Sequence, residues 1–199
     1  MGNFGVKGGK VGVDLGSVEG NKRPLTLGIK GQKGCLVNRV GVFGDSMTRD
    51  MGTKILGDIT VNCFPGCGVE KVRESIVDSK VSGFEVVWVG TNDIGDRRSI
   101  ELENKFKKLI NTMKGRDSNS ILVGVLPRVR ETNEWLSRAQ SLNDYLQIEC
   151  EKAGILFINN WELFWGCKYL YKFDGVHLND QGKKLVVDKI QSGINSFLV

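Results

Sequence analysis

From Val37 onward the chain alternates short, β-branched apolar runs with longer segments in which apolar residues recur every three or four positions. The short runs are typical of strands and the longer periodic segments of amphipathic helices. Strands separated by helices pair in parallel and take helices on both faces of the sheet, so this alternation constrains the fold more than any other feature. The predicted strands are Arg39–Phe43, Ile59–Cys63, Phe84–Val89, Ile121–Leu126 and Ile155–Ile158.

Three apolar stripes predict the helices that cover this sheet. They run over Leu102–Met113, Trp135–Leu146 and Val187–Phe197, and the first two are followed by Gly115 and Gly154. Glycine just beyond a stripe is a common helix stop. We find no internal repeat and no second domain, and we therefore predict a single α/β domain with a five-stranded parallel sheet over residues 37–199.

The first 36 residues have a different composition. They hold ten of the 26 glycines, few large apolar side chains, and six basic residues against two acidic ones, which accounts for +4 of the net charge of +5. Such a segment buries too little surface to offset the entropy of ordering. We predict a basic, mostly disordered tail over residues 1–36. Weak contact with RNA or an anionic membrane is one expectation for it, and a solvated linker is the other.

Targeting and redox features predict an intracellular protein, either cytoplasmic or nuclear. No stretch approaches the roughly 20 apolar residues of a membrane span. Residues 1–40 also lack the apolar run of about 7–15 residues that a secretory signal requires. The five cysteines form an odd, scattered set, unlike a disulfide framework. Cys63 and Cys67 have no partners that would complete a zinc site, and we predict neither metal nor organic cofactor.

Four short motifs fall at predicted strand ends or just before the last helix, where ligands bind in sheets of this kind. They are Gly44-Asp45-Ser46, Pro65-Gly66-Cys67-Gly68, Gly90-Thr91-Asn92-Asp93 and Asp174-Gly175-Val176-His177.

These motifs contain the groups of a serine nucleophile mechanism. A serine hydroxyl needs an adjacent base, and His177 is the only histidine in the chain. Asp174, three residues earlier, can orient the imidazole. The backbone N–H groups of Ser46 and Gly66 and the side-chain amide of Asn92 are candidate oxyanion donors.

Each residue alone has a plainer interpretation. Ser46 could cap a helix, Asn92 could stabilise a turn, and His177 could belong to a satisfied polar pair. Asp45 and Asp93 are expected to be structural and to bond nearby backbone groups. The occurrence of all four motifs in one order favours the catalytic interpretation.

The four motifs resemble the four sequence blocks of the SGNH/GDSL hydrolase superfamily. The resemblance implies a flavodoxin-like, three-layer α/β/α sandwich. It also implies Ser46 as nucleophile, with Asp174 and His177 completing the triad. Gly66 and Asn92 match the family's oxyanion donors. Gly68 is a weaker alternative to Gly66.

A narrower resemblance is to the esterase domain in the first open reading frame protein of some LINE retrotransposons. It rests on Cys63-Phe-Pro-Gly66, Val87-Trp-Val-Gly-Thr-Asn-Asp-Ile94, Gly124-Val-Leu-Pro-Arg128, a helix containing Asn143, and Phe173-Asp-Gly-Val-His-Leu-Asn179. This resemblance implies an esterase for short acyl chains that acts on or near lipids. The long coiled coil or Cys/His finger that often precedes such domains is lacking, so a fragment, a truncated copy and a relative with another role all stay open.

The stretch Trp161–Phe173 interleaves aromatic residues with lysines and leads into the candidate catalytic loop. It is either a long connection packed onto the sheet or the rim of an acyl pocket or interfacial patch. In the second interpretation Trp165 and Tyr169 contact substrate.

The sequence therefore predicts a serine esterase that hydrolyses carboxylic esters through an acyl-enzyme. The main alternative is a lipid-surface or nucleic-acid binding module of a retroelement-derived protein with vestigial hydrolysis. An acyltransferase using the same intermediate is a third. An intact triad favours the esterase, whereas the physiological substrate and the oligomeric state are not indicated by the sequence.

Overall fold

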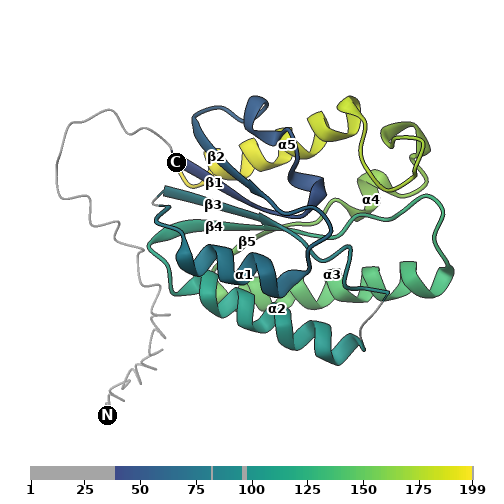
Figure 1. The fold of residues 1–199 in the computed structure, drawn as a ribbon, viewed down its shortest axis with the longest axis horizontal. Coiled ribbons are helices and arrows are strands. Elements are labelled where there is room, and N and C mark those ends of the chain that lie inside the picture. Colours follow the sequence, from purple (N-terminus) through teal and green to yellow (C-terminus); the bar gives the residue numbers. More distant parts are fainter. Residues whose placement is uncertain (1–38, 82, 96–97, 199) are drawn as a thin grey trace, which may run out of the picture. The chain divides into compact units, whose positions relative to one another are not determined.

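A computed structural model of the protein describes residues 39–81, 83–95 and 98–198. The predicted basic tail over residues 1–36 lies outside these residues. Within them the chain forms a five-stranded parallel sheet in the order β2-β1-β3-β4-β5 (Figure 1). The strands are β1 (Arg39–Gly44), β2 (Asp58–Cys63), β3 (Gly83–Trp88), β4 (Ser118–Val123) and β5 (Leu156–Ile158). The predicted fold class is confirmed.

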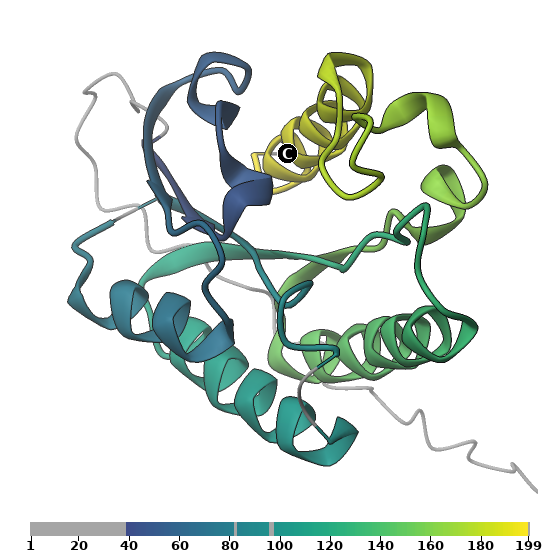
Figure 2. The same cartoon turned by 45° about the vertical axis from the view of Figure 1, so that its right-hand side comes forward.

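Helices cover both faces of the sheet and complete a three-layer sandwich (Figures 1 and 2). One layer consists of α1 (Val69–Asp78), α2 (Ser99–Lys114) and α3 (Asn133–Ala153). The other contains α5 (Asp180–Ser196) and the short α4 (Trp161–Phe164). Three single-turn 3₁₀ helices are η1 (Ser46–Thr48), η2 (Met51–Thr53) and η3 (Lys168–Leu170).

Alternate residues of the strands feed two separate apolar cores. In β1, Val42 packs with α5, whereas Phe43 faces the layer of α1, α2 and α3. In β3, Val86 and Val87 divide in the same way. Both faces of the central strands are therefore buried, which explains their nearly continuous apolar sequences.

The strand order reverses between β1 and β3, and connections that leave two such neighbouring strands diverge and create a crevice at their carboxyl ends. Gly44 at the end of β1 is paired with Cys63 of β2 and Trp88 of β3, so the three strands end at one level. A Cβ at Gly44 would lie 2.0 Å from the Trp88 carbonyl oxygen. Glycine is thus required where β1 turns toward Ser46.

A polar cluster is buried toward the amino ends of the strands, opposite the carboxyl ends where the crevice lies. Glu85 of β3 is fully buried, and one of its carboxylate oxygens lies 2.8 Å from Nε of Arg116. Neither atom has a hydrogen bond of regular geometry. The Arg116 guanidinium instead donates to the carbonyl oxygens of Ile76 and Ser79 at the end of α1. Burial raises the pKa of Glu85 from 4.5 to about 7, although Arg116 lowers it in part.

We expect this carboxyl group to make stability depend on pH. Because the folded-state pKa is raised, the folded protein holds the proton more tightly, and the free energy of unfolding falls as pH rises from about 5 to 8. Glu85→Gln removes this titration. The free energy of unfolding of the variant, measured relative to that of wild type, should therefore rise by about 2 kcal/mol between pH 5 and pH 8. Urea denaturation at pH 5, 6.5 and 8 measures the difference, with Glu151→Gln, an exposed residue on α3, as the matched control. A difference that does not change with pH would contradict the assignment.

Candidate active site

The turn after β1 is fixed by the carboxylate and carbonyl groups of Asp45. The carboxylate accepts the backbone N–H of Met47 at 2.9 Å, and the carbonyl accepts the hydroxyl of Thr48 at 2.8 Å. These bonds start η1 at Ser46, whose side chain stays partly exposed while its neighbours are buried. The turn therefore presents the Ser46 hydroxyl at the mouth of the crevice.

Asp45 itself is fully buried. Burial raises the pKa of its carboxyl group to about 6, against the lowering effects of the Met47 N–H, His177 and Arg128. Asp93 is also buried and accepts the N–H of Val69 at 3.1 Å, at the start of α1. Both aspartates bond to backbone groups, which confirms the structural role expected for them.

The structure brings the three predicted catalytic side chains together. Oγ of Ser46 lies 2.9 Å from Nε2 of His177, and Nδ1 of His177 lies 2.8 Å from Oδ2 of Asp174. Ser46 and His177 are 131 positions apart in the sequence. The chain of contacts allows a proton to pass from the hydroxyl to the imidazole while the carboxylate holds the ring.

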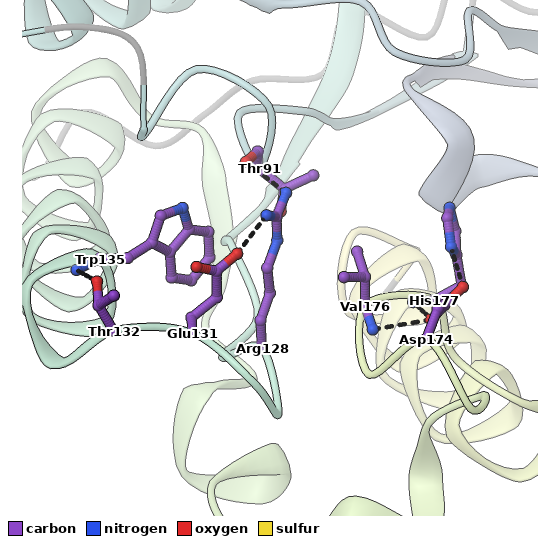
Figure 3. A network of polar contacts seen from close by, with 8 residues as sticks. All are labelled: Thr91, Arg128, Glu131, Thr132, Trp135, Asp174, Val176 and His177. Atoms are coloured by element: carbon purple, nitrogen blue, oxygen red, sulfur yellow. Dashed lines mark hydrogen bonds and ion pairs between the residues drawn. The ribbon is translucent and has the colours of Figure 1, made fainter.

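Asp174 is held by more than the imidazole. Its second oxygen, Oδ1, accepts the backbone N–H groups of Val176 and His177, each at 2.9 Å (Figure 3). Desolvation alone would raise the pKa of Asp174, but these two donors and the imidazole together lower it to about 2. The carboxylate is therefore ionised at neutral pH. Its Oδ1 is held by the backbone of the loop, and its Oδ2 orients the imidazole of His177.

The loop that carries His177 is anchored from two sides. Within the loop, the N–H of Lys172 donates to the carbonyl of His177 at 2.7 Å. Two bonds join the loop to the β4–α3 connection. The N–H of Val129 in that connection donates to the carbonyl of Gly175 at 2.8 Å, and the hydroxyl of Tyr171 donates to the carbonyl of Pro127 in the same connection. These bonds fix the loop of His177 against the β4–α3 connection.

The candidate oxyanion donors lie on the loops after β1, β2 and β3. Among the described residues, the backbone N–H groups of Ser46 and Gly66 have no acceptor. Gly66 has φ 75°, and a Cβ there would meet no atom within 4 Å, so a substrate can approach it. A Cβ at Gly68 would lie 2.5 Å from Asp93. This packing role for Gly68 favours Gly66 as the donor.

Asn92 joins the three loops. Its amide nitrogen donates to the carbonyl of Cys67 at 3.0 Å and lies 3.4 Å from Oδ2 of Asp45. The side chain is only partly buried. The long contact with Asp45 is the weaker of the two, so the amide proton on that side is the one that could turn to a substrate oxygen.

Sequence reasoning did not identify the role of Arg128, which fixes the loop before Asn92. Its guanidinium donates to the hydroxyl of Thr91 at 3.2 Å and to the Thr91 carbonyl at 2.9 Å (Figure 3). Glu131 accepts a third bond at 2.6 Å, and the guanidinium carbon lies 4.7 Å from the centre of the Trp135 ring. Two signals could have indicated this contact: the position of Arg128 beyond the carboxyl end of β4, and its place in the Gly124–Arg128 motif of the narrower resemblance.

Three cavities adjoin the loop of His177, and the largest of them, of about 290 Å³, is lined by Arg130, Lys172, Phe173 and Gly175 among others. The remaining two include residues predicted for the site. One of about 220 Å³ is lined by Ser46, Met47, Arg49, Lys172, Asp174, His177, Leu178 and Lys183. The other, of about 250 Å³, is lined mainly by apolar groups of the β4–α3 connection and the α4–η3 region, including Trp165. Trp165 is 53% exposed and stacks on Trp161, whereas Tyr169 is 66% exposed and lines neither cavity. The two aromatic residues predicted to bind substrate are therefore placed differently.

A larger cavity of about 640 Å³ lies between β2 and α1 and contains none of the four motifs among its lining residues. Its walls are mostly polar and charged, so its size does not indicate the reactive site.

In the part of the chain that the structure describes, no three His, Cys, Asp or Glu side chains are grouped so that they could hold a metal ion. None of the helices described there combines the length and apolar character needed to cross a bilayer.

Comparisons with solved structures find similar folds. A GDSL-like lipase from Bacteroides thetaiotaomicron is 17% identical and has a TM-score of 0.70, with 80% of this chain and 88% of that chain covered. A carbohydrate acetylesterase from Sinorhizobium meliloti is 12% identical with a TM-score of 0.63, and the match covers 80% and 99%. At such low sequence identity, these two matches show that the folds are similar and nothing more.

A third match concerns the sequence. The esterase domain of the ORF1 protein from the zebrafish ZfL2-1 retrotransposon is 34% identical, and the match covers 79% of this chain and 99% of that domain, with a TM-score of 0.47. No protein-family model matches the chain, and no curated protein matches it.

Proposed function

This chain belongs to the SGNH/GDSL hydrolases, a family of carboxylic ester hydrolases, and on this premise we propose that it is a serine esterase with Ser46 as nucleophile. The observation that carries the proposal is the hydrogen-bonded chain from Ser46 through His177 to Asp174. A serine with an adjacent base, itself oriented by a third group, is the arrangement that activates a hydroxyl.

In the proposed acylation step, Oγ of Ser46 attacks the ester carbonyl and its proton passes to Nε2 of His177. The negative charge that develops on the carbonyl oxygen is stabilised by the N–H groups of Ser46 and Gly66 and by the amide of Asn92. The ionised Asp174 stabilises the imidazolium that forms. His177 then gives its proton to the leaving alcohol as the carbon–oxygen bond breaks, and the acyl group stays on Ser46.

In deacylation, His177 removes a proton from a water molecule that attacks the acyl-enzyme. The tetrahedral intermediate uses the same donors, and its collapse releases the carboxylic acid and returns the proton to Ser46. An alcohol in place of water would give the acyltransferase alternative, and no contact in the site favours it.

We propose short acyl chains as substrates. The mainly apolar cavity lined by Trp165, of about 250 Å³, is smaller than the roughly 300–1,000 Å³ that drug-sized ligands occupy. We assign Trp165 to the apolar wall that contacts the acyl group, because its side chain lines this cavity.

A fluorophosphonate and an ester series test the proposal together. The fluorophosphonate should modify the peptide that contains Ser46, detected by mass spectrometry, and block turnover in parallel. Among p-nitrophenyl esters from acetyl to palmitoyl, kcat/KM should be highest for the shortest chains. Modification at another residue, or turnover that survives complete labelling of Ser46, would contradict the proposal.

The alternative of a binding module is supported by exposed aromatic residues near the site. Trp165, Tyr169 and Phe173 are 53%, 66% and 90% exposed, and the ring of Phe173 lies 5.0 Å from the Arg130 guanidinium carbon. Such groups suit an anionic lipid surface. The match with the zebrafish esterase domain supports a retroelement origin. Vesicle binding without ester turnover would favour this alternative, whereas RNA or membrane contact through residues 1–36 stays a prediction.

A further inference from the structure

The cavity beside the triad has an unusual charge pattern. Its wall contains Arg49, Lys172 and Lys183 in addition to the catalytic groups, and Asp174 is its one acidic residue. Asp174 is already engaged by His177 and two backbone N–H groups. The cavity therefore gathers cationic side chains at the point where an ester would bind.

One of the three cations is neutralised. Lys183, on the first turn of α5, lies 2.9 Å from Oδ2 of Asp50, and its side chain is only 10% exposed. Arg49 and Lys172 also lie close enough to contribute to the lowered pKa of Asp50, after the bond from Lys183. Among the described residues, however, neither of their side chains forms an ion pair. Two exposed positive charges are left at the edge of the cavity.

The position of these charges identifies which half of an ester they face. The cavity includes Ser46 and His177 but neither Gly66 nor Asn92, so from the nucleophile it extends toward the base and away from these two oxyanion donors. The base gives its proton to the leaving oxygen, and the alcohol half of the ester must therefore lie on this side. Lys172 is fixed there, because its backbone N–H donates to the carbonyl of His177.

We propose that Arg49 and Lys172 form an anion-binding subsite, so that the preferred esters carry a negatively charged group on the alcohol. This inference rests on the proposed function and names its substrate class. Overall charge does not account for it, since +4 of the net charge of +5 belongs to residues 1–36 and the domain carries only about +1. The attraction is local and is weakened by salt, because the screening length falls from about 10 Å at 0.1 M to about 3 Å at 1 M.

Three phenyl acetates with para substituents of similar size test the subsite. They are 4-acetoxybenzenesulfonate, the neutral 4-acetoxybenzenesulfonamide and the cationic 4-acetoxyphenyltrimethylammonium. Each kcat/KM is divided by the rate of hydroxide-catalysed hydrolysis of the same ester, which removes the leaving-group difference. We expect the wild type to prefer the sulfonate over the sulfonamide by about tenfold at about 0.05 M salt, with the cationic ester slowest.

The double variant Arg49→Gln, Lys172→Gln should lower the sulfonate-to-sulfonamide ratio below about threefold, and about 0.5 M salt should do the same to the wild type. Arg49→Lys, which keeps the charge, should retain most of the preference. The matched control is the double variant Lys114→Gln, Lys152→Gln. These two exposed lysines lie in the last turns of α2 and α3, near the amino ends of β4 and β5 and far from the carboxyl ends of the strands.

The outcomes separate the inference from the function on which it rests. A wild-type ratio near one, or a ratio unaffected by the double variant, overturns the subsite. An equal fall in the control variant also overturns it, because the preference would then arise from the field of the whole protein. If no ester is hydrolysed in a way that depends on Ser46, the proposed function fails and the subsite fails with it.

Discussion

Ser46→Ala is expected to reduce kcat for ester hydrolysis by about 10⁴–10⁶, with the fold intact. The hydroxyl is the group that forms the acyl-enzyme, and no other hydroxyl or thiol lines the cavity of about 220 Å³ beside His177. The substitution removes one oxygen whose observed partner is Nε2 of His177, and the turn is held by Asp45 instead. Thermal unfolding should therefore change little.

Initial rates with p-nitrophenyl acetate, at enzyme concentrations high enough to detect residual turnover, measure this loss. Ser137→Ala, at an exposed position on α3, is the matched control and should keep wild-type kcat. If Ser46→Ala retains more than about a tenth of the wild-type kcat, Ser46 is not the nucleophile, because loss of a triad serine costs far more than that.

The sheet and the place of the site were predictable because each central strand has a distinct local signal. The run Phe84–Val89 is almost wholly apolar and is followed by Gly90. Parallel strands bring their carboxyl ends to one edge of the sheet. Helix α1 was not predicted, because only Val69, Val72 and Ile76 of its ten residues are buried. So short a stripe is weak evidence for a helix, and its start depends on Asp93, which is distant in sequence.

The features that sequence reasoning missed depend on contacts between distant segments. The contact between Arg128 and Thr91 spans 37 positions and joins two loops, and no local pattern encodes it. Arg49, just after η1, and Lys172, shortly after η3, line one cavity although they are far apart in the sequence. Trp165 and Tyr169 share an aromatic-rich segment, and only the path of α4 and η3 decides that Trp165 faces a cavity.

The second large effect is expected for Asp174→Asn, which should lower kcat by about 10⁴. Oδ1 of Asp174 accepts two backbone N–H groups, so an asparagine must keep its carbonyl oxygen there. Its NH₂ group then faces Nδ1 of His177, where the carboxylate now lies at 2.8 Å. An NH₂ group donates and cannot accept, which forces the proton of neutral imidazole onto Nε2. Nε2 is the atom 2.9 Å from Ser46, and in this tautomer it cannot take the hydroxyl proton.

This geometry distinguishes a tautomer effect from simple loss of charge. Asp174→Ala leaves Nδ1 free to keep its proton by bonding to water, so it should be less damaging than Asp174→Asn despite the larger deletion. Asp180→Asn, a nearby aspartate with a side chain 94% exposed, is the matched control and should have little effect. Pre-steady-state acylation by p-nitrophenyl acetate, together with the nitrogen chemical shifts of the imidazole, measures both the rate and the tautomer. If Asp174→Asn acylates faster than Asp174→Ala, or if Nδ1 stays protonated in the asparagine variant, the carboxylate does not set the tautomer of His177.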